Sequence, residues 1–195
     1  MAYEIEMKAW VLDWEALEAT LRDRCTFERL FRKEDRYFAT PDGEGLVRVR
    51  IDAAPGSAGR ALGGGSCGAY VTSKEKHVHE GMERNLEREF GVDDAEAFID
   101  LVTSFGCRET FAKTKAGLRF TRDGLTVELA RVQGLGDFLE VECVVADDNA
   151  AEGDAARHRE AAARIRAFFS ELGVPDERIE PRPYMQLLRE RRGEG

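Results

Sequence analysis

The first strand-like stretch of the chain, residues 3–11, alternates apolar and charged side chains. The apolar positions are Tyr3, Ile5, Met7 and Ala9, and the charged positions are Glu4, Glu6 and Lys8. Because successive side chains of a β-strand point to opposite faces, one face of this strand is apolar and the other is charged. On one strand alone, a charged face is typical of a sheet that contacts water on one side.

The same pattern recurs along the chain. Like charges stand two residues apart in five later stretches, which are residues 47–51, 71–76, 86–89, 111–115 and 138–143. A face that only contacted water would mix charged with neutral polar residues, because like charges side by side repel. With Lys8 and Glu128 added, the charged positions are seven bases and seven acids: Lys8, Arg48, Arg50, Lys74, Lys76, Lys113 and Lys115, and Glu4, Glu6, Glu87, Glu89, Glu128, Glu140 and Glu142. This balance indicates that the strands share one interior.

The sequence therefore predicts an α+β fold in which about eight antiparallel strands form a β-barrel with helices packed outside. Burying an ion without a partner costs at least several kcal/mol, so such a barrel must enclose a water-filled tunnel. After the first strand, further strands are expected at residues 37–40, 46–51, 70–76, 86–90, 111–115, 118–122, 125–132 and 138–145. Asp123 and Gly124 form a short hairpin signal, and residues 41–43 and 134–136 are further turn signals.

Apolar residues at helical spacing predict three helices outside the sheet. The first follows the N-cap Asp13, the second follows Asp93 or Asp94 and ends at Gly106, and the third covers residues 154–172. The expected buried positions are Trp14, Leu17 and Leu21 in the first, Ala97, Phe98, Leu101 and Val102 in the second, and Ile165, Phe168, Phe169 and Leu172 in the third. A short last turn at residues 184–188 completes a helical C-terminal segment, residues 154–190.

Residues 52–69 are rich in Gly, Ala and Ser, which predicts a mobile loop at the mouth of the barrel. A phosphate-binding Gly loop is less favoured, because no Gly-Lys-Ser/Thr sequence follows. His77 and His79 lack a third metal ligand nearby, so a solvated loop is the preferred interpretation of that stretch.

The length of the chain and its net charge limit the number of domains and the kinds of partner. A chain of 195 residues fits one domain, residues 1–195. The net charge of −9 and the pI near 5.0 argue against nucleic acid and anionic membranes as partners. The four cysteines form no C-x-x-C pair and are interpreted as reduced thiols. No signal peptide and no run of ~18 apolar residues is found, so a cytoplasmic location is expected.

Separate acidic and basic walls suit a polyanion that enters the tunnel with divalent cations. Mg²⁺ uses one or two carboxylates and fills its other positions with water and phosphate oxygens, and Mn²⁺ also prefers oxygen ligands. The basic wall would bind the phosphates, because Arg offers paired donors and Lys a movable point charge. The pattern therefore predicts a triphosphate as substrate and Mg²⁺ or Mn²⁺ as cofactor.

The ordered set of charged motifs, from Glu4-x-Glu6-x-Lys8 to Glu140-x-Glu142, resembles the CYTH superfamily, also called triphosphate tunnel metalloenzymes. The resemblance covers about residues 3 to 188. Within the superfamily, residues 134–140 and 180–188 are most similar to class IV adenylyl cyclases, which convert ATP to cyclic AMP and pyrophosphate. Other members hydrolyse inorganic triphosphate or thiamine triphosphate. Dimers occur in the superfamily, so a homodimer is one expectation.

The resemblance also implies roles for individual residues. Metal ligands are expected at Glu4, Glu6 and Glu140, with Glu128 and Glu142 in the same metal-binding set. Triphosphate contacts are expected at Lys8, Arg48, Arg50, Lys74, Lys76, Lys113 and Lys115. Of these, Lys8, Lys113 and Lys115 are the expected catalytic residues, and Glu87 and Glu89 are expected tunnel acids.

Four positions depart from the pattern of the superfamily. Lys115 stands where Arg is usual and Glu128 where Asp is usual, while Asn85 replaces a frequent Arg and Pro183 replaces a Ser. These departures keep three functions open: a class IV-type adenylyl cyclase first, an inorganic or thiamine triphosphatase second, and a non-catalytic polyphosphate or nucleotide-binding module third.

Overall fold

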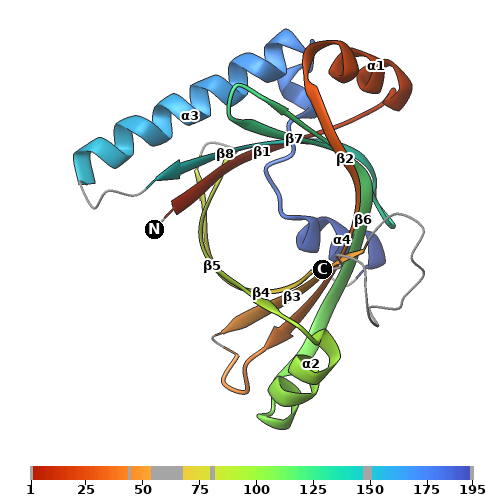
Figure 1. Cartoon of the computed structure of the whole chain (residues 1–195), viewed down its shortest axis with the longest axis vertical. Coiled ribbons are helices and arrows are strands. Elements are labelled where there is room, and N and C mark those ends of the chain that lie inside the picture. The colour runs from red at the N-terminus through yellow and green to blue at the C-terminus, as the bar shows by residue number, and fades with distance from the viewer. Residues whose placement is uncertain (1, 44, 54–67, 80–81, 147–150, 194–195) are drawn as a thin grey trace. The chain divides into compact units, whose positions relative to one another are not determined.

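The computed structural model describes residues 2–43, 45–53, 68–79, 82–146 and 151–193 (Figure 1). Its elements are β1 Ala2–Trp10, α1 Trp14–Arg24, β2 Thr26–Ala39, β3 Leu46–Ala53, β4 Ala69–His79, β5 Met82–Val92, α2 Ala95–Ser104, β6 Arg108–Arg122, β7 Leu125–Val132, β8 Gly136–Ala146, α3 Ala151–Glu171, the 3₁₀ turn η1 Asp176–Arg178 and α4 Tyr184–Arg192. Most of the predicted glycine-rich loop, residues 54–67, lies outside the described residues. Its predicted ends are wrong, because Asp52 belongs to β3 and Ala69 to β4.

The predicted α+β class with about eight antiparallel strands is confirmed for the described part of the chain, which has eight. Hydrogen-bonded neighbours follow the order β1-β5-β4-β3-β2-β6-β7-β8, and β8 pairs in turn with β1, so the strand order closes on itself as in a barrel. None of the described helices combines the length and the apolar character needed to span a bilayer. The described cysteines Cys25, Cys107 and Cys143 are free thiols, as expected.

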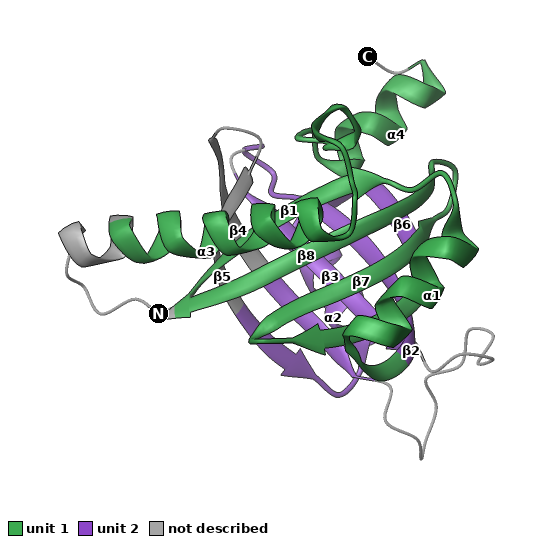
Figure 2. Cartoon of the chain, turned by 90° about the horizontal axis from the view of Figure 1, so that it is seen from above, with its two compact units in different colours: residues 1–29, 75–86, 117–195 green, residues 30–74, 87–116 purple. Residues whose placement is uncertain are grey.

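The chain is divided into two compact units (Figure 2). Unit 1 comprises residues 1–29, 75–86 and 117–195, and unit 2 comprises residues 30–74 and 87–116. Several long strands contribute one end to each unit, and each unit has its own charged residues.

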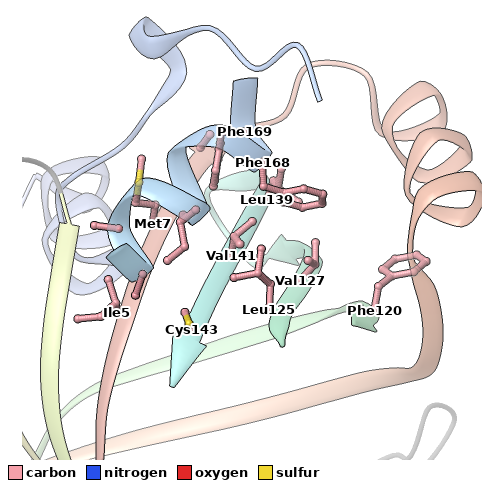
Figure 3. Packing of buried hydrophobic residues seen from close by; sticks show 14 of the residues in the cluster. Ile5, Met7, Phe120, Leu125, Val127, Leu139, Val141, Cys143, Phe168 and Phe169 are labelled. Carbon is pink, nitrogen blue, oxygen red and sulfur yellow. The ribbon is translucent and has the colours of Figure 1, made fainter. Parts of the chain in front are cut away.

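The core of unit 1 lies between the apolar faces of β1, β7 and β8 and helix α3. Figure 3 shows Phe168 and Phe169 of α3 against Leu139 and Val141 of β8, with Met7 of β1 in the same cluster. All of these side chains are at most 4% exposed. The alternation in the first strand is therefore confirmed, because Ile5, Met7 and Ala9 lie in this core and the charged positions lie on the opposite face.

In unit 2, helix α2 packs on β3. Asp94 is the N-cap of α2, since its side chain accepts a hydrogen bond from the Ala97 amide at 3.0 Å. The predicted buried face was partly wrong. Ala95 and Ile99 are buried, whereas Ala97 is exposed and Leu101 is 49% exposed.

The strand predicted at residues 37–40 is the end of a much longer one, β2, which begins at Thr26. The earlier part was missed because charges stand on both faces of β2. Arg36, on the outer face, donates to Glu109 at 2.6 Å, whereas Asp35 is buried. Such a segment shows no alternation between apolar and polar residues.

The strands predicted at residues 111–115 and 118–122 form one continuous strand, β6. Gly117 lies inside this strand, where the Leu129 carbonyl approaches it closely. His77 and His79, expected in a loop, belong to β4.

The predicted hairpin at Asp123 and Gly124 is confirmed, and their φ values of 50° and 74° are those of a tight turn. The predicted last turn is the full helix α4.

Candidate functional site

The predicted acids of unit 1 lie side by side on β1, β8 and β7, and we call Glu4, Glu6, Glu128, Glu140 and Glu142 the acidic cluster. Antiparallel register sets Glu140 directly between Lys8 on β1 and Glu128 on β7. One step along the strands, Glu142 faces Glu6. Opposite residues on paired strands share a face, so the structure brings this predicted set together in one place.

Like charges face each other twice in this cluster, at Glu6 and Glu142 and at Glu128 and Glu140. Directly opposed like charges destabilise a sheet. The cluster is also partly removed from water, since Glu128 is 5% exposed, Glu140 8% and the neighbouring Lys8 3%. Cations are therefore favoured at this face, and the protein supplies some of them itself.

Arg119 of β6 is one such cation, and the sequence did not identify it. Its guanidinium lies 3.4 Å from Glu128 and 3.0 Å from Glu28, and it reaches Thr126 at 3.5 Å. Arg119 has no charged neighbour two residues away, so it did not match the doublet pattern. The ion pair gives Glu128 a partner inside unit 1.

Tyr184, the first residue of α4, donates a hydrogen bond to Glu140 at 2.5 Å. Its ring packs edge-on against Phe138 with centroids 4.8 Å apart, and the Lys8 Nζ lies 5.3 Å from the ring centroid. Burial and the carboxylates of Glu140 and Glu6 raise the pKa of Tyr184 well above its ordinary range. The phenol therefore stays protonated and donates to Glu140. The sequence singled out both segments but not this contact.

Glu180 fixes the chain just before α4. Its carboxylate accepts hydrogen bonds from Arg182 at 2.7 and 2.6 Å and from the Trp10 indole at 3.0 Å. The Glu180 amide also donates to the Lys8 carbonyl at 2.9 Å. These bonds tie the α4 segment to β1 beside the acidic cluster.

We expect Glu180→Gln to change how stability depends on pH. The hydrogen bonds from Arg182 outweigh burial and lower the pKa of Glu180 to about 2. A lowered pKa means that the carboxylate stabilises the fold above its unfolded pKa near 4.5, and that this contribution is lost as the pH falls toward 2. The variant should lose about 2 kcal/mol of unfolding free energy at pH 7, allowing for solvent around Arg182.

Denaturant unfolding at a series of pH values checks this expectation. Between pH 4.5 and 2 the Glu180→Gln variant should lose less stability than the wild type does. Glu177→Gln, at an exposed position of η1, is the control and should follow the wild-type curve. Parallel curves for wild type and Glu180→Gln would contradict the assignment.

Two of the predicted bases of unit 2, Arg50 and Lys113, contact an acid that the sequence did not identify. Asp35 of β2 faces Arg50 of β3 in the antiparallel register. Its carboxylate accepts hydrogen bonds from Arg50 Nε at 2.7 Å and Nη2 at 3.0 Å, and the Lys113 Nζ lies 3.1 Å away. We call Asp35, Arg48, Arg50, Lys113 and Lys115, together with Lys33, the basic cluster.

Arg48 contacts a different part of unit 2. Its guanidinium donates to the Thr72 hydroxyl at 2.9 Å and lies 3.5 Å from Glu89, while the Thr72 hydroxyl donates to Glu89 at 3.0 Å. Glu89, predicted as a tunnel acid, therefore pairs with a predicted phosphate-binding residue.

Lys33 and Lys115 lie over the same aromatic ring. Their Nζ atoms are 4.9 and 5.8 Å from the centroid of Phe31, and both lysines are buried. Lys33 was missed for the same reason as Asp35, because the intervening Arg32 and Glu34 hide the two-residue period. The cation–π contacts hold both ammonium groups on one face of the unit.

The side chains of Lys74, Lys76 and Glu87 lie outside the described part of the structure, and their predicted roles stay predictions. Among the side chains that the structure describes, no three His, Cys, Asp or Glu form a ready-made metal site. The acidic cluster nevertheless has suitable donors for Mg²⁺ or Mn²⁺, which need only one or two carboxylates when phosphate oxygens and water complete the shell. Glu4, Glu6 and Glu140 are the residues that would hold the ion.

A family model described as the CYTH domain matches residues 2–184. A search of curated proteins found no match. Among solved structures, a protein of Pyrococcus horikoshii is similar with 25% identity and a TM-score of 0.77, over 96% of this chain and 98% of that one.

Two further structures share the fold at lower identity. A candidate adenylate cyclase from Vibrio parahaemolyticus has 16% identity and a TM-score of 0.71, with 95% of this chain and 97% of that chain covered. A candidate adenylyl cyclase from Hippeastrum, described as having a dominant triphosphatase activity, has 15% identity and a TM-score of 0.62, with 99% and 96% covered.

Proposed function

The chain belongs to the CYTH domain family, and on that premise we propose that it is a metal-dependent enzyme that acts on a triphosphate. The observation that carries the proposal is the pairing of like charges on β1, β8 and β7, where Glu6 faces Glu142 and Glu128 faces Glu140. A divalent cation relieves this repulsion. The basic cluster of unit 2 offers donors for phosphate oxygens.

In this proposal Glu4, Glu6 and Glu140 hold Mg²⁺ or Mn²⁺. When bound, the ion would neutralise negative charge on the phosphates. Arg48, Arg50 and Lys113 bind phosphate oxygens, because Arg gives paired donors and Lys a point charge. Lys8, Lys113 and Lys115 stabilise the charge that develops on the transferred group and on the leaving oxygen, which is the main requirement of phosphoryl chemistry.

For the reaction itself, we favour conversion of ATP to cyclic AMP and pyrophosphate. The ribose 3′-oxygen bonds to the α-phosphorus, the bond from that phosphorus to the α,β-bridging oxygen breaks, and the hydroxyl proton passes to solvent or a base. The two segments that resemble class IV cyclases, residues 134–140 and 180–188, meet through the hydrogen bond from Tyr184 to Glu140. This contact supports the cyclase reading, because it joins both segments at a candidate metal ligand.

Triphosphate hydrolysis is the second candidate. The fold is compatible with both reactions, because the Hippeastrum protein, which shares this fold, is described as having a dominant triphosphatase activity. Incubation with ATP, tripolyphosphate and thiamine triphosphate in Mg²⁺ or Mn²⁺, followed by chromatography of the products, separates them. Cyclic AMP with pyrophosphate supports the cyclase, and orthophosphate without cyclic nucleotide supports the triphosphatase. Metal-independent binding without turnover would instead indicate a binding module.

We expect Lys8→Ala and Arg48→Ala to weaken tripolyphosphate binding roughly tenfold more than orthophosphate binding, because one phosphate cannot contact several cations at once. Calorimetric titration in Mg²⁺ measures both affinities. Arg189→Ala, at an exposed position of α4, is the matched control and should leave both affinities unchanged. Equal losses for the two ligands would contradict a site that spans several phosphates.

A further inference from the structure

Asp35 is a buried acid among cations, and none of the functional roles above depends on it. It is 1% exposed, and it lies within 3.1 Å of two cations that the proposed function assigns to phosphate binding, Arg50 and Lys113. Arg48 contacts Thr72 and Glu89 in the same unit. A carboxylate in a phosphate-binding cluster repels the substrate, so its presence there requires an explanation.

The carboxylate of Asp35 is ionised. Burial alone would raise its pKa, but Arg50, Lys113 and Arg48 together hold the pKa well below its ordinary range. Asp35 therefore carries a negative charge beside the two cations that it contacts directly, Arg50 and Lys113.

The contact with Arg50 is directional. A guanidinium has five N–H donors in a rigid plane, and Asp35 accepts from Nε and Nη2, which lie on one edge. Two hydrogen bonds to one carboxylate fix the plane and therefore the direction of the remaining donors. The same carboxylate holds the Lys113 ammonium near Arg50, although the two cations repel each other.

We propose that Asp35 is a positioning residue for triphosphate binding, which fixes the plane of Arg50 and the place of Lys113 before the substrate arrives. This inference rests on the proposed function. Cations that are already oriented lose little conformational entropy when the phosphates bind, and oriented donors stabilise charge more strongly than mobile ones. Asp35 thus strengthens triphosphate binding in spite of its charge.

Calorimetric titration with tripolyphosphate in Mg²⁺ tests the proposal on the full-length chain. Asp35→Asn should bind at least tenfold more weakly than the wild type, whereas removal of a mere counter-charge would tighten binding. Glu34→Gln is the matched control, because it removes the same charge from the adjacent residue of β2, where Glu34 pairs with Arg32 on the outer face. Its affinity should stay within about twofold of the wild type.

A double-mutant cycle shows whether Asp35 acts through Arg50. Arg50→Lys keeps the charge but loses the two-point contact with Asp35. Its affinity for tripolyphosphate should therefore also be about tenfold weaker than that of the wild type. The double variant Asp35→Asn with Arg50→Lys should bind no more than about threefold more weakly than either single variant. Fully additive losses, or unchanged or tighter binding by Asp35→Asn, would overturn the proposal.

A measurement on the wild type keeps the proposal testable if Asp35→Asn does not fold. The Arg50 Nε–H should give a slowly exchanging ¹⁵N resonance both before and after saturation with tripolyphosphate. Disappearance of this protection on binding would overturn the proposal, because the hydrogen bond between Arg50 and Asp35 would then not persist in the complex. If the wild type does not bind tripolyphosphate at all, the proposed function fails instead.

Discussion

Glu6→Gln is expected to lower turnover of the triphosphate substrate at least about a thousandfold and to leave the fold intact. The substitution removes one carboxylate charge from the acidic cluster and keeps the shape of the side chain. The neighbouring Ile5 and Met7, on the other face of β1, remain in the core. Loss of the charge also relieves the repulsion from Glu142, so the melting temperature without metal should stay the same or rise.

Steady-state assays and thermal unfolding, each with and without Mn²⁺, check this expectation. The wild type should gain thermal stability from Mn²⁺, and the variant should gain much less. Glu4→Gln should behave similarly, whereas Glu160→Gln, at an exposed position of α3, should behave as the wild type. Unchanged turnover in Glu6→Gln would contradict its assignment as a metal ligand.

Gly117→Ala is expected to destabilise the protein by more than about 3 kcal/mol or to prevent folding. A Cβ atom at this position would lie 2.0 Å from the Leu129 carbonyl oxygen and 2.8 Å from the Ala130 Cα. Both are backbone atoms of β7, so no side-chain rotation relieves the clash. β6 and β7 would have to separate next to Glu128.

Gly91→Ala is the matched control, because it makes the same change inside another strand, β5. A Cβ at Gly91 would meet its nearest atom, the Ala69 carbonyl oxygen, at 3.9 Å, which is an ordinary contact. Glycine weakens a strand interior, so this variant should be as stable as the wild type or slightly more stable. Denaturant unfolding compares the two variants. A Gly117→Ala protein as stable as Gly91→Ala would show that β7 does not approach Gly117 closely.

The sequence predicted the parts of the fold in which one face of an element is apolar. In β1, alternation placed Ile5 and Met7 in the core, and the structure confirms it. The helix of Ile165, Phe168 and Phe169 was predicted for the same reason. The period of about 2 residues in a strand, or about 3.6 residues in a helix, is visible only where apolar and polar residues are segregated.

The period fails where both faces carry charges. Arg32 and Arg36 lie on the outer face of β2 while Lys33 and Asp35 are buried, so neither the first part of this strand nor its buried ions could be predicted. Contacts between segments far apart in the chain could also not be predicted from the sequence. The hydrogen bond from Tyr184 to Glu140 joins residues 44 positions apart, and no local pattern encodes it.

A crystal structure with Mn²⁺ and an ATP analogue that carries methylene in place of the α,β-bridging oxygen gives the most direct test of the proposed metal ligands and phosphate-binding residues. The analogue cannot lose pyrophosphate, so the complex should persist. The anomalous signal of Mn²⁺ should lie at carboxylate oxygens of Glu4, Glu6 or Glu140, with the triphosphate against Arg48, Arg50 and Lys113. A nucleotide bound away from these residues, or bound with no Mn²⁺ at these carboxylates, would contradict the proposed function.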